Sequence, residues 1–157
     1  MEEKRIDSIL RGKIEGYCSR AERSEYDVRK RLRQLEAELS PQVEDEIIEH
    51  LLQNNFINPE RYIRAFIHDK LYLNGWGRVK IAAMLRERRL PGGVVDRALA
   101  EIPEADYLEI LCKTIEQKRR TIRGSDEYAN RVKLMRAVAS RGFESHLVIK
   151  YLDIEDK

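Results

Sequence analysis

Cysteine, proline, glycine and aromatic residues are all scarce in this chain. Its 157 residues include 2 Cys, 4 Pro and 8 Gly, and aromatic side chains make up only 7% of the total. The shortage of proline and glycine leaves long stretches free to form helices, and this composition is unlike that of a β-sandwich or barrel. Charged residues, at 37%, suit amphipathic helices. We therefore expect an all-α protein.

The two cysteines, Cys18 and Cys112, stand alone and lack the spacing of metal ligands. The chain does not open with a basic segment followed by an apolar one. It also has no apolar run near the roughly 18 residues that cross a bilayer. We therefore expect a cytoplasmic protein with reduced thiols and no membrane contact.

Patterns typical of catalysis are missing as well. The glycine pair Gly92-Gly93 lacks the downstream Lys-Ser/Thr and the preceding strand of a phosphate-binding loop. No acid stands at the Glu-x-x-His spacing that carboxylate-bridged metals use. We interpret the three histidines, His50, His68 and His146, as surface or capping residues. We expect no enzymatic activity, no metal and no cofactor.

One pattern of four apolar positions occurs three times. The copies are Val28, Leu32, Ile47 and Leu51; Ile81, Leu85, Val95 and Leu99; and Leu134, Val138, Val148 and Leu152. The last two copies differ by a constant 53 residues, whereas the first has a longer connection inside it. Repetition of one supersecondary unit is typical of extended arrays with long binding surfaces. We predict three tandem three-helix, helix–turn–helix-like repeats at residues 1–55, 56–102 and 103–153, followed by a short acidic tail at 154–157.

Helix start signals agree with this division. Ser24, followed three positions later by Asp27, indicates a short capping box. Ser40-Pro41 and Asn58-Pro59 each combine a capping residue with proline at the first helical position. We expect helices over residues 4–19, 104–123 and 127–140, and turns at 74–77 and 90–93.

Net charge says little about the partner, because 30 Lys and Arg against 28 Asp and Glu leave only +2. The distribution of charge is more informative. Basic residues gather once in each repeat, between residues 20 and 33, 78 and 89, and 118 and 123. A solvated helix face is the commoner explanation of any one such cluster.

Several segments, taken in order, resemble the RecX family of proteins that regulate RecA recombinase. In the first repeat these are Arg23-Ser24-Glu25 with Val28 and Leu32. In the second they are Arg61-Tyr62, Ala65-Phe66, Trp76-Gly77-Arg78 and Lys80-Ile81 with Leu85, and in the third Arg141-Gly142-Phe143 with Ile149. Two departures are the valine at position 28, where leucine is usual, and Asn58-Pro59 before Arg61, where an acid is common.

The resemblance implies a curved array that lies in the groove of a RecA filament on DNA and inhibits or modulates ATP turnover, strand exchange and co-protease function. It implies the RecA nucleoprotein filament as partner, with single- or double-stranded DNA nearby, and we expect a monomer. As exposed contacts we predict ten residues: Arg29, Lys30, Arg33, Arg78, Lys80, Arg88, Arg89, Lys118, Arg119 and Arg120.

Three other interpretations stay open at this point. The helix–turn–helix pattern also fits a stand-alone DNA-binding protein, although the weak net charge argues against it. The Trp76 turn could contact a base or a partner, but packing between two helices of the second repeat is the favoured interpretation. A hydrolase built on Cys18 or Cys112 would require a depressed thiol pKa.

Overall fold

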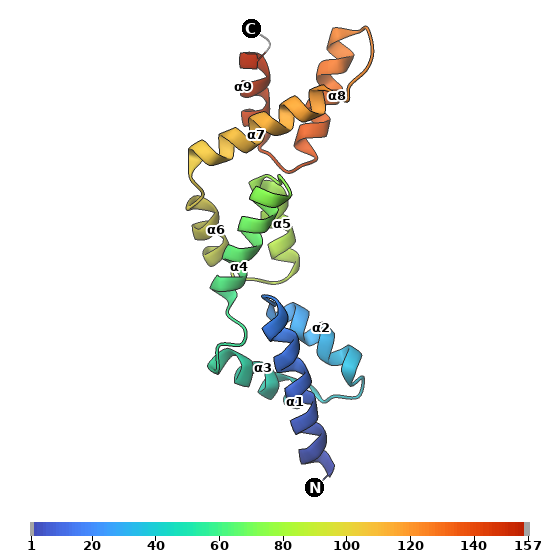
Figure 1. Ribbon diagram of the computed structural model, residues 1–157, viewed down its shortest axis with the longest axis vertical. Coiled ribbons are helices and arrows are strands. Elements are labelled where there is room, and N and C mark those ends of the chain that lie inside the picture. Colours follow the sequence, from blue (N-terminus) through green and yellow to red (C-terminus); the bar gives the residue numbers. More distant parts are fainter. Residues whose placement is uncertain (1, 156–157) are drawn as a thin grey trace.

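The computed structural model describes the backbone of residues 2–155 and the side chains of residues 8–153. Its elements are α1 (Glu2–Arg20), α2 (Glu25–Leu35), α3 (Pro41–Gln53), α4 (Pro59–His68), the π-helical turn η1 (Asp69–Leu73), α5 (Arg78–Glu87), α6 (Gly92–Ala100), α7 (Glu104–Arg119), α8 (Glu127–Ala139) and α9 (Ser145–Glu155). Three groups, α1–α3, α4–α6 and α7–α9, follow one another along the long axis, and the two ends of the chain lie at opposite ends of it (Figure 1). The predicted all-α array of three tandem repeats is confirmed. Residues 156 and 157 of the predicted tail lie outside the described residues.

The predicted caps begin the helices where expected. Ser24 and Asp27 form a complete capping box, in which Ser24 Oγ accepts from Asp27 N at 3.1 Å and Asp27 Oδ2 accepts from Ser24 N at 3.0 Å. The side chains of Ser40 and Asn58 likewise accept from the third residue of α3 and α4. These polar residues satisfy backbone donors that a helix start leaves unpaired.

Two boundaries differ from the expectation. Gly92 and Gly93 belong to the first turn of α6, because the chain reverses earlier, at Arg89, whose φ is 57°. Helix α7 ends at Arg119 rather than near residue 123. Thr121 Oγ1 donates to the Lys118 carbonyl at 2.8 Å and so satisfies one of the acceptors at the end of that helix.

All twelve positions of the repeated apolar pattern are buried. None of them is more than 8% exposed, and Val28, Leu51, Ile81 and Leu85 are completely buried. Burying a valine or leucine side chain favours folding by about 1.5–3 kcal/mol. The repeat visible in the sequence is therefore the repeat that forms the cores.

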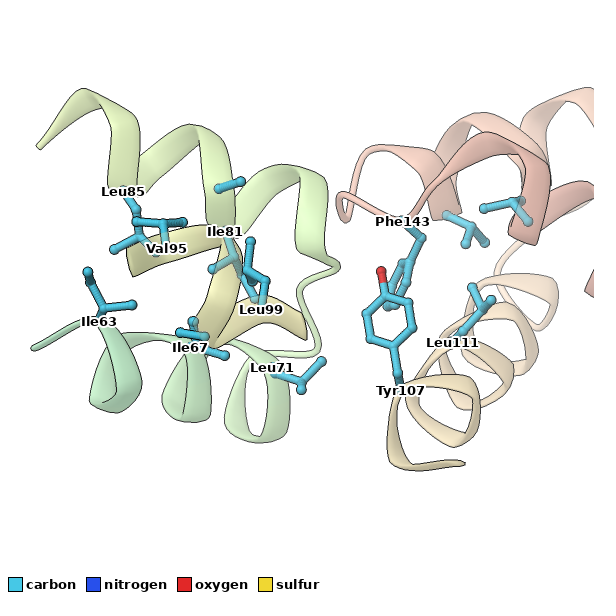
Figure 2. Packing of buried hydrophobic residues seen from close by; sticks show 14 of the residues in the cluster. Ile63, Ile67, Leu71, Ile81, Leu85, Val95, Leu99, Tyr107, Leu111 and Phe143 are labelled. Atoms are coloured by element: carbon cyan, nitrogen blue, oxygen red, sulfur yellow. The ribbon is translucent and has the colours of Figure 1, made fainter. Parts of the chain in front are cut away.

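Among the described side chains these cores are two rather than three. Helices α1–α3 pack around one apolar cluster, which also takes in Phe56 and Ile57 from the connection to α4. Helices α4–α9 share a second, continuous cluster. Figure 2 shows it running from Ile63 through Ile81 to Tyr107. The predicted repeat boundaries at 55/56 and 102/103 stay predictions.

The second and third repeats join at a close backbone contact. Gly77 N donates to the Arg141 carbonyl at 2.8 Å, and Val79 N donates to the Gly142 carbonyl at 2.9 Å. Beside them the rings of Tyr107 and Phe143 lie 5.5 Å apart between centroids (Figure 2). Two segments more than 60 residues apart in the chain are thus held together by main-chain hydrogen bonds as well as by ring packing.

The Trp76 side chain packs against the shared core and is partly buried, which agrees with the packing interpretation of this turn. The ammonium groups of Lys70 and Lys80 lie 4.8 Å and 4.2 Å from the centroid of its ring. Cations over an indole face add a modest attraction. Trp76 and Lys80 therefore belong to the same local packing unit.

Substitution of Gly77 tests the close contact between the repeats. A Cβ at this position would lie 2.3 Å from the Gly142 carbonyl oxygen, which is backbone and cannot give way cheaply. We expect Gly77→Ala to lower the free energy of unfolding by at least about 2 kcal/mol in urea titrations followed by circular dichroism. The matched control is Gly93→Ala in α6, where a Cβ meets nothing within 4 Å. It should be neutral or stabilising by up to about 1 kcal/mol. Equal effects of the two substitutions would contradict the contact.

Candidate binding groove

A cavity of about 480 Å³ lies between the first and second repeats. We call it the junction groove and define it by its lining residues: Arg23, Ser24, Glu25, Tyr26, Arg29, Lys30, Arg33, Leu52, Ile57, Pro59, Arg88, Arg89, Leu90 and Pro91. Helix α2 forms one wall, and the turn between α5 and α6 forms the other. The lining holds six cations against one carboxylate, so it favours anionic groups.

The groove brings together five of the ten predicted contact residues. Arg29, Lys30 and Arg33 come from α2, and Arg88 and Arg89 come from the turn after α5. Two basic clusters that lie more than 50 residues apart in the sequence therefore face one cavity. The groove also includes Arg23 and Tyr26, which were not among the predicted contacts.

Arg29 is held firmly by carboxylates. Its guanidinium donates to Glu44 Oε1 and Asp45 Oδ1 at 2.8 Å each, and to Glu25 Oε1 at 2.9 Å. Burial alone would lower the pKa of Arg29, but these hydrogen bonds outweigh it and raise that pKa above its ordinary value. Arg29 joins α2 to α3 by compensating the buried carboxylate of Glu44, and its charge is largely used inside the fold.

Arg88 is also engaged inside the protein. Its Nη1 lies 3.2 Å from Asp27 Oδ1 and donates to the hydroxyl of Tyr62. Burial, followed by the nearby charge of Asp27, raises the pKa of Tyr62, so this hydroxyl stays protonated near neutral pH. The side chain of Arg88 is 29% exposed and remains part of the groove lining.

Lys30 and Arg89 are the cations most available to a partner. Both are exposed, and neither forms an ion pair with any side chain that the structure describes. Arg33 is 70% exposed at its side chain and lies 3.6 Å from Glu44, which is a long contact. The exposed ring of Tyr26 lies in the same lining. The sequence places Tyr26 on a helix face but does not predict that it lies beside the exposed cations of this groove.

Arg78 lies at the other junction, between the second and third repeats. Its Nη2 is 2.8 Å from Glu104 Oε2, and its Nη1 is 2.9 Å from Glu144 Oε2. The guanidinium carbon also stands 3.7 Å from the centroid of the Tyr107 ring. Burial and the hydrogen bond to Glu144 raise the pKa of Tyr107. Arg78 therefore acts mainly as a clamp between repeats.

The third predicted cluster lies at the end of α7. Arg120 is exposed and lies 3.7 Å from Glu116 one turn earlier, whereas Lys118 and Arg119 are partly buried. Arg119 lines a separate cavity with Tyr128. This cluster is not part of the junction groove.

The expectation that all ten residues are exposed is therefore wrong for six of them. Lys30, Arg33, Arg89 and Arg120 are exposed. The other six are only partly exposed: Arg29, Arg78, Lys80, Arg88, Lys118 and Arg119. Carboxylates hold Arg29, Arg78 and Arg88, and the ammonium group of Lys80 lies over the Trp76 ring.

Burial disfavours the thiolate form of Cys18. It is 7% exposed, and burial raises the pKa of its thiol to about 11, with smaller contributions from surrounding charges. This argues against the hydrolase reading at Cys18. Within the described residues no cluster of His, Cys, Asp and Glu could hold a metal ion. The described helices include none that is long and apolar enough to cross a bilayer.

An elongated tandem array of three-helix repeats with an open basic groove is typical of helical-repeat binding proteins. Residues 59–99 match the family model described as "RecX, second three-helix domain", and residues 104–152 match "RecX, third three-helix domain". Together these matches cover more than half of the chain. The chain belongs to the RecX family.

Named relatives agree with this assignment. The chain is 28% identical over 112 residues to "Regulatory protein RecX" of Vibrio campbellii, covering 70% of this chain and 69% of that protein. It is 26% identical over 151 residues to "Regulatory protein RecX" of Streptococcus agalactiae, covering 88% of this chain but only 54% of that protein. Its relatives are thus named as regulatory proteins rather than enzymes.

Solved structures share the fold. The chain superposes on a crystal structure of "regulatory protein RecX" with a TM-score of 0.84 at 20% identity, and the match covers 96% of this chain and 73% of that one. The crystal structure of RecX from Lactobacillus salivarius has a TM-score of 0.81 at 17% identity, with 96% of each chain covered. At this level of identity the likeness concerns the fold alone.

Charge reversal distinguishes a structural cation, Arg78, from an exposed cation of the groove, Lys30. Arg78→Glu would place a third carboxylate beside Glu104 and Glu144, so we expect it to lower the free energy of unfolding by roughly 2–4 kcal/mol. Lys30→Glu, at an exposed cation with no described ion pair, should change it by less than about 0.5 kcal/mol. Urea unfolding of both variants checks this. An Arg78→Glu variant as stable as the unmodified chain would contradict the structural role of Arg78 and favour its interpretation as an exposed contact.

Alkylation tests the state of Cys18. A thiol with a pKa near 11 has about a hundredfold less thiolate at pH 8 than one with an ordinary pKa of 9.0. In a Cys112→Ala variant, iodoacetamide should therefore modify Cys18 far more slowly than it modifies a free cysteine derivative at pH 8. Reaction at the speed of the free compound would show an accessible, activated thiol.

Proposed function

We propose that this protein binds the RecA nucleoprotein filament and inhibits its ATP hydrolysis, strand exchange and co-protease activity. Membership of the RecX family and the regulatory naming of its relatives support this proposal. So does the elongated shape, which lets one chain reach more than one subunit of a filament (Figure 1). The protein acts as a monomer in the cytoplasm, without catalysis of its own.

The junction groove is the proposed contact, and the gathering of two distant basic clusters in it is the observation that carries this step. Lys30, Arg89 and the outer part of Arg33 offer charge that no internal carboxylate neutralises closely. Such cations attract phosphate groups and acidic protein surfaces, and they speed association at low salt. Arg120 contributes a further exposed cation on the third repeat.

The test is RecA-dependent ATP hydrolysis on single-stranded DNA, with this protein titrated below one copy per RecA. We expect dose-dependent inhibition, because one elongated molecule occupies several subunits. The double variant Lys30→Glu/Arg89→Glu removes the free groove cations and should require at least about tenfold more protein for the same inhibition, which corresponds to roughly 1.4 kcal/mol of binding.

The matched control is Lys13→Glu/Lys133→Glu. It makes the same change in net charge at two exposed lysines outside the groove and should inhibit like the unmodified chain. Equal loss in both double variants would indicate a general charge effect. No inhibition by the unmodified chain, together with binding to duplex DNA without RecA, would favour the stand-alone DNA-binding reading.

A further inference from the structure

The two junctions of the array are built from different interactions. Between the second and third repeats the apolar cluster is continuous, and main-chain hydrogen bonds from Gly77 and Val79 cross the boundary. Between the first and second repeats no residue belongs to both apolar clusters. The described chain therefore consists of two separately packed bodies, α1–α3 and α4–α9.

Charged and polar side chains connect these two bodies. Arg61 Nε in α4 lies 2.6 Å from Glu22 Oε1 in the α1–α2 connection. Arg88 lies 3.2 Å from Asp27 in α2, and the Tyr62 hydroxyl accepts from Arg88. The side chains of Arg61 and Glu22 are 38% and 32% exposed, so water and salt reach them. Ion pairs of this kind are weak and are screened by salt.

Arg88 has two roles at this junction. It holds Asp27 of the first body, and it also lines the groove in which a partner would bind. An anionic group that enters the groove meets Arg88 and competes with the Asp27 carboxylate for the same guanidinium. Occupation of the groove and the contact between the bodies are therefore linked through one side chain.

We propose that the junction of the first and second repeats is an ionic elbow. The pairs of Arg88 with Asp27 and of Arg61 with Glu22 set the orientation of α1–α3 relative to α4–α9, and an anionic group in the groove releases Arg88 and lets the first body turn. The elbow rests on the proposed function only in that the groove is where the partner binds. It would let one chain adjust to the helical surface of a filament without unfolding either core.

The test measures the distance between the two bodies in the isolated chain. Spin labels are placed at Gln42→Cys in α3 and Lys133→Cys in α8, both exposed, in a Cys18→Ala/Cys112→Ala background. Raising the ionic strength from about 0.1 M to 1 M shortens the Debye length from about 10 Å to 3 Å. We expect the distance distribution to broaden and its mean to shift, with unchanged helical circular dichroism.

Charge variants test which ion pairs hold the two bodies in their relative orientation. Asp27→Asn keeps an acceptor for the Ser24 cap but loses the charge that Arg88 needs, so its distribution should be broad already at 0.1 M salt. Glu101→Gln is the matched control, because its partner Arg64 lies in the same body. Reversal of the other pair in Glu22→Arg/Arg61→Glu should narrow the distribution relative to Glu22→Arg alone. A distribution that neither salt nor these variants change would overturn the elbow.

Competition for Arg88 is tested with inorganic pyrophosphate against sodium chloride at matched ionic strength. Pyrophosphate should broaden the distribution at a lower ionic strength than chloride does, and Lys30→Gln/Arg89→Gln should reduce that difference. Equal effects of the two salts would overturn the link between groove and elbow. These measurements contain no RecA, so the elbow and the proposed function can fail independently.

Discussion

Burial of four apolar side chains, two on each of the last two helices of a repeat, is the constraint on which this architecture depends. A three-helix unit of about 50 residues buries too little surface to be very stable by itself. The second and third repeats meet this limit by sharing one core, with Tyr107 and Phe143 filling the boundary between them. The first repeat builds its own core and draws Phe56 and Ile57 into it from the connection to α4.

Local signals in the sequence predicted the helices and the repeats well. The pairing of Ser24 with Asp27 depends on residues three positions apart, so the capping box could be recognised without a structure. The residues of the regularly spaced apolar pattern are also the ones that are buried, because helical periodicity determines which side chains face inward. The α6 start was misplaced, since the left-handed backbone of Arg89 leaves no mark in composition.

The candidate site was harder to predict, because it depends on residues that are distant in the sequence. Nothing near Arg78 indicates that Glu104 and Glu144 come back to it, and nothing near Arg88 indicates Asp27. A basic cluster in a sequence therefore mixes cations that hold the fold with cations that face solvent. Only the folded chain separates Lys30 and Arg89 from Arg29, Arg78 and Arg88.

This separation explains how one surface can combine a rigid frame with an adaptable contact. In α4–α9 the ion pairs of Arg78 lie beside a continuous core and main-chain hydrogen bonds. The orientation of the second and third repeats is therefore held by more than these ion pairs. At the first junction the same type of ion pair has no shared core beneath it. Similar interactions therefore have different consequences, because the apolar packing around them differs. In the proposed function, one rigid and one polar junction would let the two bodies adjust to a partner's curvature while the helices stay intact.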